Sequence, residues 1–209
     1  MSSSELDALK KTPFFAHHVA RGARMVDFGG WALPIQYEGI LAEHRAVREG
    51  VGLFDVSHMG EFLVEGPGAE SFLQGITTND VSALEDGQAQ YTVALYEAGG
   101  IVDDLLIYRR SPDRYLVCVN AACIDKDWAW FTTHHDLERD ACTLVNASDD
   151  YAQLAIQGRH AETLLQTLTT IDLGAIAYYR FAEGELAGIP CIVARTGYTG
   201  EDGFELFFG

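Results

Sequence analysis

The stretch GGIVDDLLIYRRSPDRYLVCVN, residues 99–120, decides the fold around it. Two apolar runs rich in β-branched residues, 101–108 and 115–119, are separated by a polar connection that contains a proline. Such runs on either side of a turn-forming connection are typical of a β-hairpin. The sequence therefore predicts a hairpin here, and the two glycines at 99 and 100 allow a sharp entry into its first strand.

Asp103 and Asp104 do not fit a plain hairpin, because the residues around them would bury well. Consecutive side chains of a strand point to opposite faces, so one carboxylate shares the face of Ile101 and the other that of Val102. One of the two is therefore expected on an otherwise apolar face. A buried, unpaired carboxylate is costly, so such a position indicates either a hydrogen-bonding network or a chemical role.

Composition and charge exclude several classes of protein. The 209 residues are 48% hydrophobic and 22% charged, as in ordinary globular proteins, and the formal net charge is −17. This acidity argues against binding to nucleic acid or to an anionic membrane, since both need basic surface. No apolar run reaches the roughly 18 residues of a membrane span, and residues 1–5 have neither the basic start nor the apolar core of a signal peptide.

The cysteines point to the compartment. Cys118, Cys123, Cys142 and Cys191 show no C-x-x-C spacing, and two of them lie in strand-like apolar runs. We expect four reduced thiols and a cytoplasmic protein.

The order of expected elements indicates an α+β fold. A helix is expected over 40–49, a single strand in GLFDVSHMGEFLVEG, and a helix over 69–76. A strand over 89–96, the hairpin, a helix from Ala121 or Ala122 to about Thr133 and a strand over 142–146 complete a ferredoxin-like, split βαβ unit with one extra strand. We divide the chain into residues 1–60, an irregular arm and helix packing on the second module, residues 61–146, the first module, and residues 147–209, a second, truncated module.

An internal repeat supports two modules. LVEGPGAESFLQGITTNDV, residues 63–81, matches AIQGRHAETLLQTLTTIDL, residues 155–173, at eight of nineteen positions. Both segments predict a strand, a turn with glycine and an amphipathic helix, so one supersecondary unit is used twice. The second copy lacks the helix and strand that follow the hairpin of the first. We expect an uncovered sheet face there, and infer that the chain is a fragment of a longer protein.

Several segments together resemble the T protein family of the glycine cleavage system. They are GARMVDFGGWALPIQY, FDVSHMGEF, TNDV, GGIVDDLLIY, VNAACIDKDW and RTGYTGEDGFEL, and they cover nearly the whole chain. The resemblance implies a folate-binding aminomethyltransferase fold and a tetrahydrofolate-dependent enzyme. Its members take an aminomethyl group from the lipoylated H protein, release ammonia and form 5,10-methylenetetrahydrofolate.

The same resemblance implies a set of site residues. Asp104, the second carboxylate of the pair, is implied as the catalytic residue, since a fixed anion can orient the folate amine and stabilise iminium-like charge. Glu205 is implied to accept two neighbouring N–H groups of the pterin in a fork. The remaining implied contacts to folate are Asn120, Tyr178, Tyr198, Tyr91 and Tyr108.

Other kinds of site find less support in the sequence. Ser57 and His58 lack the motif of a catalytic triad, and we expect His58 to be an inward-facing, hydrogen-bonded histidine. Adjacent histidine pairs and scattered cysteines do not predict a metal site.

Two rival functions stay open: a folate-dependent demethylase of the same superfamily, and a folate-binding accessory protein in iron–sulfur cluster maintenance. T-family proteins also carry a later GARD segment and a C-terminal domain, both absent from these residues, so we expect weak or no transfer by them alone.

Overall fold

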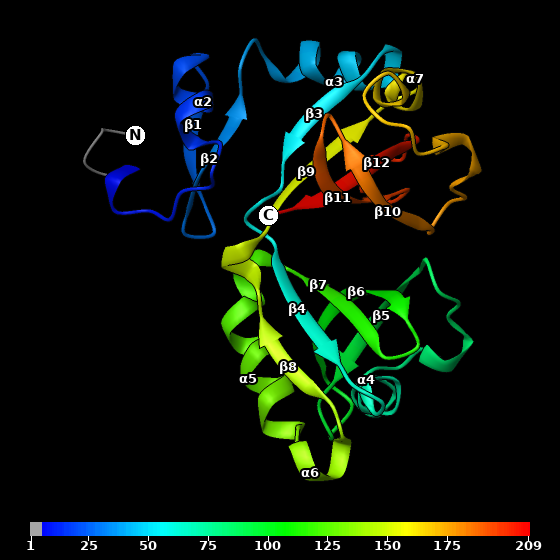
Figure 1. Cartoon of the computed structure of the whole chain (residues 1–209). Helices are drawn as coiled ribbons and strands as arrows, with labels where there is room; N and C mark the ends of the chain where they lie inside the picture. The colour runs from blue at the N-terminus through cyan, green and yellow to red at the C-terminus, as the bar shows by residue number, and fades with distance from the viewer. Residues whose placement is uncertain (1–5) are drawn as a thin grey trace. The chain divides into compact units, whose positions relative to one another are not determined.

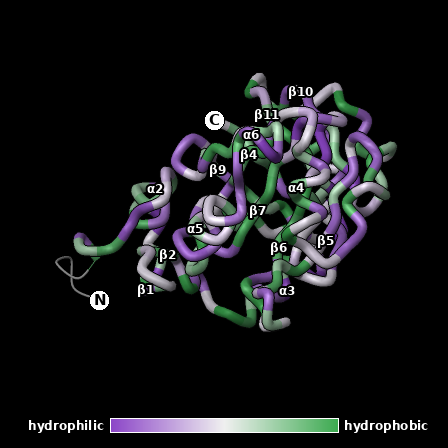
Figure 2. The backbone as a smooth tube through the Cα atoms, turned by 90° about the horizontal axis from the view of Figure 1, so that it is seen from below, coloured by the Kyte–Doolittle hydropathy of each residue, from purple (hydrophilic) through white to green (hydrophobic). Residues whose placement is uncertain are grey.

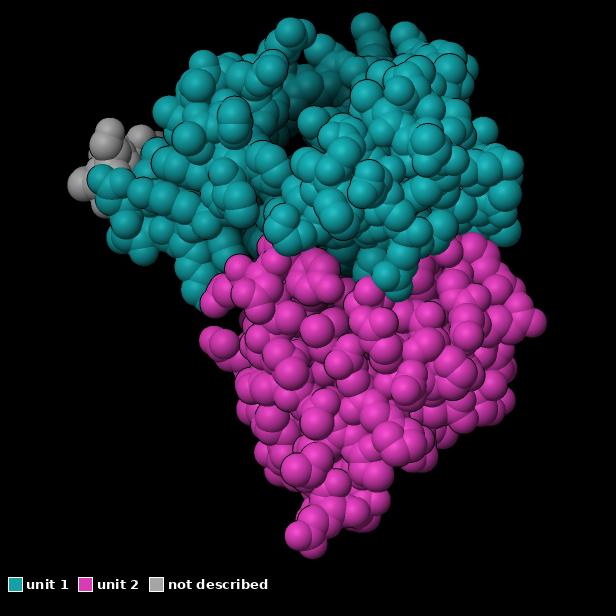
Figure 3. Space-filling view, in the orientation of Figure 1, with its two compact units in different colours: residues 1–58, 152–178, 182–209 teal, residues 59–151, 179–181 magenta. Residues whose placement is uncertain are grey.

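The structure is a computed structural model that describes residues 6–209, so the first five residues of the predicted N-terminal arm lie outside the described part. The chain divides into two compact units, coloured separately in Figure 3. Unit 1 contains residues 1–58, 152–178 and 182–209, and unit 2 contains residues 59–151 and 179–181. No helix among the described residues is long and apolar enough to cross a membrane.

Unit 2 is a five-stranded antiparallel sheet with helices on one face (Figure 1). The strand order is β5-β6-β7-β4-β8, and the predicted hairpin forms its β6-β7 pair. Its elements are β4 (Gly60–Glu65), α4 (Ala69–Ile76), η1 (Val81–Ala83), β5 (Gln88–Leu95), β6 (Ile101–Ser111), β7 (Arg114–Val119), η2 (Ala121–Cys123), α5 (Ile124–His134), α6 (Leu137–Asp140), β8 (Thr143–Asn146) and η3 (Ser148–Asp150).

Burial separates the two faces of this sheet. Phe62, Leu105 and Val117 are buried against Phe72 of α4 and Phe131 of α5 in one hydrophobic cluster. The strand β7, which lies inside the sheet, is largely hydrophobic along its length (Figure 2). Because side chains alternate along each strand, the residues between these core positions point to the face that the helices leave open.

Unit 1 holds a second five-stranded sheet, of order β10-β11-β12-β9-β3, and a separate hairpin β1-β2. The helix predicted over 40–49 is confirmed. The elements are α2 (Phe15–Ala20), β1 (Arg24–Phe28), β2 (Trp31–Gln36), α3 (Ile40–Glu49), β3 (Gly52–Asp55), β9 (Ala152–Gln157), α7 (Ala161–Gln166), η4 (Leu173–Ala175), β10 (Phe181–Leu186), β11 (Ile189–Ala194) and β12 (Gly203–Phe208).

The prediction of one strand through GLFDVSHMGEFLVEG is wrong. The segment forms two strands, β3 in the sheet of unit 1 and β4 in the sheet of unit 2. The break begins at Asp55, whose Oδ1 accepts the backbone N–H of Ser57 at 3.0 Å. Such an Asx-type bond turns the chain out of the extended conformation, and an apolar pattern alone does not reveal it.

The internal repeat is confirmed in three dimensions. Gln74 accepts the backbone N–H of Val81 through Oε1 and donates to the carbonyl of Asn79. Gln166, its counterpart, accepts the N–H of Leu173 and donates to the carbonyl of Ile171. In both copies, the same pair of glutamine hydrogen bonds therefore ties the helix to the turn that follows it.

The two sheets also share a strand order, with β3 at the edge position that β8 occupies in unit 2. In the sheet of unit 1 this edge position is filled by residues 52–55, which lie far earlier in the chain than the second copy of the repeat.

Candidate functional site

The open face of the unit 2 sheet carries the aspartate that the sequence singled out. Asp103 and Asp104 point to opposite faces of β6, as alternation requires: Asp103 shares the side of Leu105 and α5, and Asp104 is exposed on the other side. Val93 of β5 pairs with Asp104 across the sheet. The carboxylate at 104 is thus presented to whatever approaches this face.

Asn120 lies beside this carboxylate, at the end of β7. Its Nδ2 donates to the backbone carbonyl of Asp104 at 3.0 Å, and lies 3.4 Å from Oδ1 of the same residue. It also lies 3.2 Å from each carboxylate oxygen of Asp103. With the amide nitrogen held by these acceptors, the amide oxygen is the group left to accept a hydrogen bond from a ligand. The structure therefore brings two of the predicted site residues together.

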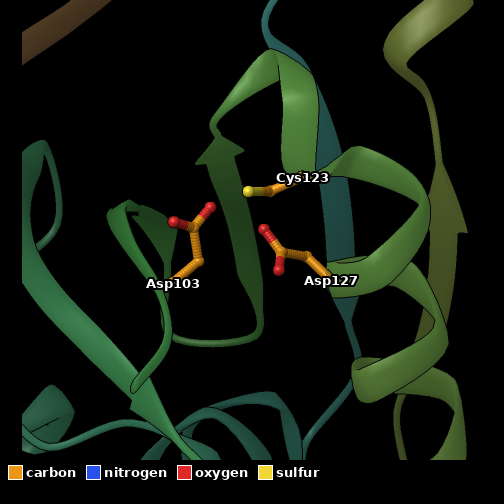
Figure 4. Close-up of side chains that lie close together, drawn as sticks. All are labelled: Asp103, Cys123 and Asp127. Carbon is orange, nitrogen blue, oxygen red and sulfur yellow. The ribbon is translucent and has the colours of Figure 1, made fainter.

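Sequence reasoning missed a cluster on the other side of β6. Asp103, Cys123 and Asp127 each place a potential ligand atom within 4.8 Å of the other two (Figure 4). Cys123 is the N-cap of α5, and Asp127 lies four residues later, about one turn into the helix. A C-x-x-x-D spacing is not a signal by itself, because it gains meaning only when β6 brings Asp103 next to it.

Two predicted tyrosines also belong to unit 2. Tyr91 of β5 is 49% exposed on the same face as Asp104 and pairs with Leu106. Tyr108 of β6 is fully buried, and its ring packs edge-on against Phe181 with centroids 5.7 Å apart. The first therefore offers an accessible aromatic face, while the second is part of the packed interior.

Glu205 belongs to β12 in unit 1 and points away from the hydrophobic cluster under α7. Its neighbours Phe204 and Leu206 are buried in that cluster, as the alternation in FELFF predicts. Thr196 donates through Oγ1 to Oε2 of Glu205 at 2.5 Å, and Gln153 donates through Nε2 to Oε1 at 3.2 Å. Burial raises the pKa of the Glu205 carboxyl above its ordinary value, while these two hydrogen bonds oppose the rise. The carboxylate is therefore held in one orientation.

Of the remaining predicted tyrosines, Tyr198 lies in the Gly-rich turn between β11 and β12, and Tyr178 lies beside this turn. Tyr178 is 71% exposed and, with Thr196 and Glu201, lines a cavity of about 300 Å³ at this turn. Tyr198 is fully exposed. Gly197 has a φ of +157°, and a Cβ there would lie 2.1 Å from Oε1 of Gln157, so the turn tolerates only glycine at this point.

Ser57 and His58 are both buried but do not form a nucleophile and base. The Ser57 hydroxyl donates to the carbonyl of Gln153 at 3.1 Å. His58 packs edge-on against Phe28, and its Nδ1 has no hydrogen-bond partner among the described residues. The prediction of an inward-facing His58 is confirmed, but the predicted hydrogen bond is not present at Nδ1. Burial lowers the pKa of this imidazole.

The chain is similar to proteins of known family. Residues 14–209 match the family described as the GCVT N-terminal domain. A protein named aminomethyltransferase from Halalkalibacterium halodurans is 56% identical over 200 residues, which are 95% of this chain and 54% of that protein. The chain thus spans about half the length of the curated relatives that it matches.

Solved structures share the fold. The glycine cleavage system aminomethyltransferase T from Bartonella henselae superposes with a TM-score of 0.86 at 33% identity, covering 96% of this chain and 54% of that one. A heterotetrameric sarcosine oxidase from Corynebacterium sp. U-96 superposes with a TM-score of 0.53 at 18% identity, covering 80% of this chain and 81% of that one. The second likeness extends to the fold alone.

Proposed function

Because the chain belongs to the GCVT N-terminal domain family, we propose that it is the folate-binding portion of an aminomethyltransferase of the glycine cleavage system. The whole protein takes the aminomethyl group from the lipoylated H protein and passes the one-carbon unit to tetrahydrofolate, with release of ammonia. The observation that carries this proposal is the Asp104 carboxylate, exposed beside the Asn120 amide on the open face of the unit 2 sheet.

Asp104 is the proposed catalytic residue. An amine must attack the one-carbon unit while ammonia departs, and positive iminium-like charge develops on the way. A fixed carboxylate lowers the energy of that charge and orients the attacking N–H group. Asn120 supports it by offering an amide oxygen to the same ligand, since its nitrogen is already committed to Asp103 and to the carbonyl of Asp104.

Glu205 is the proposed recognition residue for the pterin. A pterin presents a ring N–H and an exocyclic amine side by side, and one carboxylate accepts both. The contacts from Thr196 and Gln153 hold the carboxylate in place for such a fork. Tyr91, Tyr178 and Tyr198 supply exposed rings on which a flat heterocycle can stack, whereas Tyr108 contributes by packing.

The first prediction separates binding from turnover. We expect the 209-residue chain to bind tetrahydrofolate but to form little or no methylenetetrahydrofolate with aminomethyl-loaded H protein, since it spans about half the length of its relatives. Extending the chain to the relatives' full length should give robust transfer. Calorimetric titration under reducing conditions measures binding, and a coupled assay measures transfer. An absence of folate binding would contradict the proposed function.

The second prediction concerns Glu205. Replacing Glu205 with alanine is expected to weaken tetrahydrofolate binding by on the order of 10- to 100-fold, because two charge-assisted hydrogen bonds are lost. The affinity of Glu205→Gln should lie between those of the parent and Glu205→Ala, since the amide oxygen still accepts one hydrogen bond but the NH₂ group repels the other pterin donor. Glu185→Ala, which removes an exposed carboxylate from β10, is the matched control. Unchanged affinity in Glu205→Ala would remove the assignment.

A further inference from the structure

The cluster of Asp103, Cys123 and Asp127 also contacts one ammonium group, that of Lys126. Asp127 of α5 is 1% exposed, although an aspartate is seldom buried so completely. Lys126 donates through Nζ to Oδ1 of Asp127 at 2.5 Å and to the carbonyl of Val102 at 2.5 Å. The second oxygen, Oδ2 of Asp127, is buried and has no hydrogen-bond partner among the described residues. One lysine therefore faces two aspartates, and one buried oxygen remains unsatisfied.

A single proton between the two carboxyl groups resolves this imbalance. If Asp127 carries the proton, its O–H donates to the carboxylate of Asp103, and the buried excess charge disappears. Burial raises the pKa of the Asp127 carboxyl to about 7, Lys126 opposes this rise, and the neighbouring Asp103 adds to it. The charged and titratable groups near Asp127 are Asp103 on β6, Lys126 on α5 and the thiol of Cys123.

Asn120 connects this cluster to the open face. Its Nδ2 lies 3.2 Å from both oxygens of Asp103 and 3.0 Å from the carbonyl of Asp104. The position of Asp103 therefore determines where the Asn120 amide can lie, and with it the local geometry at Asp104. A negative charge on Asp127 would repel Asp103 and disturb this arrangement.

We propose that Asp103 and Asp127 are positioning residues that share one proton and, through Asn120, hold the Asp104 side of the sheet in its ligand-binding geometry. This inference rests on the proposed function only where folate binding is measured. A metal ion is the competing occupant of the cluster. The contacts favour the proton, because Lys126 and Asn120 already use acceptor positions of both carboxylates. Burial and the nearby Asp103 also raise the pKa of the Cys123 thiol, which disfavours the thiolate that a metal requires.

The first experiment needs no folate. In the 209-residue chain, carboxyl ¹³C NMR should show Asp127 titrating near pH 7, and the side-chain amide resonances of Asn120 should move with the same midpoint. Asp127→Asn should abolish the movement at Asn120, and Asp103→Asn should lower the midpoint of Asp127. Asp125→Asn, an exposed neighbour on α5, should change neither. Titration of Asp127 near pH 4 would overturn the proposal, and so would Asn120 amide resonances that do not move when Asp127 titrates.

The second experiment adds ligands. Tetrahydrofolate affinity of the parent chain should fall by about tenfold between pH 6 and pH 8, whereas Asp127→Asn, a neutral isostere, should retain the low-pH affinity throughout. Asp127→Ala should bind weakly at both values. If the parent binds no folate at either pH, the proposed function fails. The NMR titration then still tests whether Asp103 and Asp127 share a proton. Tight Zn²⁺ binding that is lost in Cys123→Ala and Asp127→Asn would overturn the shared proton in favour of a cation.

Discussion

Replacing Asp104 with asparagine is expected to lower the rate of one-carbon transfer by on the order of 10²- to 10³-fold in a protein of the relatives' full length. The amide keeps the shape of the side chain but removes the charge that would stabilise the developing cation. The expected loss lies in kcat, because charge development occurs in the transition state and not in the bound substrate. Initial rates with saturating tetrahydrofolate and aminomethyl-loaded H protein measure it.

Stability should hardly change in the same variant. Asp104 is exposed, so its replacement should alter the free energy of unfolding of the 209-residue chain by less than about 0.5 kcal/mol. Asp113→Asn, in the exposed turn between β6 and β7, is the matched control and should leave the transfer rate unaffected. Full transfer activity in folded Asp104→Asn would show that the reaction does not depend on this carboxylate.

The local elements of the fold could be predicted because periodicity and turn residues reported them directly. The hairpin of residues 99–120 and the helices α3 and α4 lie where the pattern placed them. The break between β3 and β4 could not be predicted, because an unbroken apolar pattern continues through two strands of different sheets. The role of β3 was hidden for another reason: β8 follows the hairpin of the first copy, whereas the equivalent edge strand of the second sheet comes from far earlier in the chain, outside the repeat.

In the site, too, features set by neighbouring residues could be predicted, whereas contacts between distant segments could not. Alternation along β6 was enough to predict that Asp103 and Asp104 face opposite sides, and the structure confirms it. Which of them faces the core depends on which face of β6 the helices cover, and the pattern could not decide this because β6 carries apolar residues on both faces. The contacts of Asp127 with Lys126 and of Asn120 with Asp103 depend on packing between α5 and β6, so they required the structure.

Packing also accounts for the burial of Asp55, the aspartate of the FDVSH segment. The side chain of Asp55 is 2% exposed, and it accepts hydrogen bonds from the Thr12 hydroxyl at 2.5 Å and from Nε2 of His18 at 2.8 Å. The other ring nitrogen of His18 lies 2.7 Å from the Tyr37 hydroxyl. The end of β3 is therefore tied to the N-terminal segment through one buried carboxylate.

Asp55→Ala is expected to destabilise unit 1 by about 3–5 kcal/mol, because the Thr12 and His18 side chains lose their buried acceptor. Hydrogen exchange measures the loss at the amides of β3 and β9, which separates this unit from unit 2. Glu38→Ala, which removes an exposed carboxylate in the same unit, is the control and should change exchange little. Equal protection in Asp55→Ala and the parent would mean that the network contributes no stability.

The pH dependence gives an independent check on this carboxylate. Burial alone would raise the pKa of Asp55, but the hydrogen bonds from Thr12, His18 and Ser57 outweigh it and hold the pKa below its ordinary value. A lowered pKa in the folded state means that the stabilisation is complete above pH about 4 and is lost as the pH falls through the folded value. The difference in protection between the parent and Asp55→Ala should therefore be constant from pH 7 to pH 5 and shrink toward pH 3. A difference that grows in acid would require the opposite sign of shift, and would show that burial of this carboxylate outweighs its hydrogen bonds.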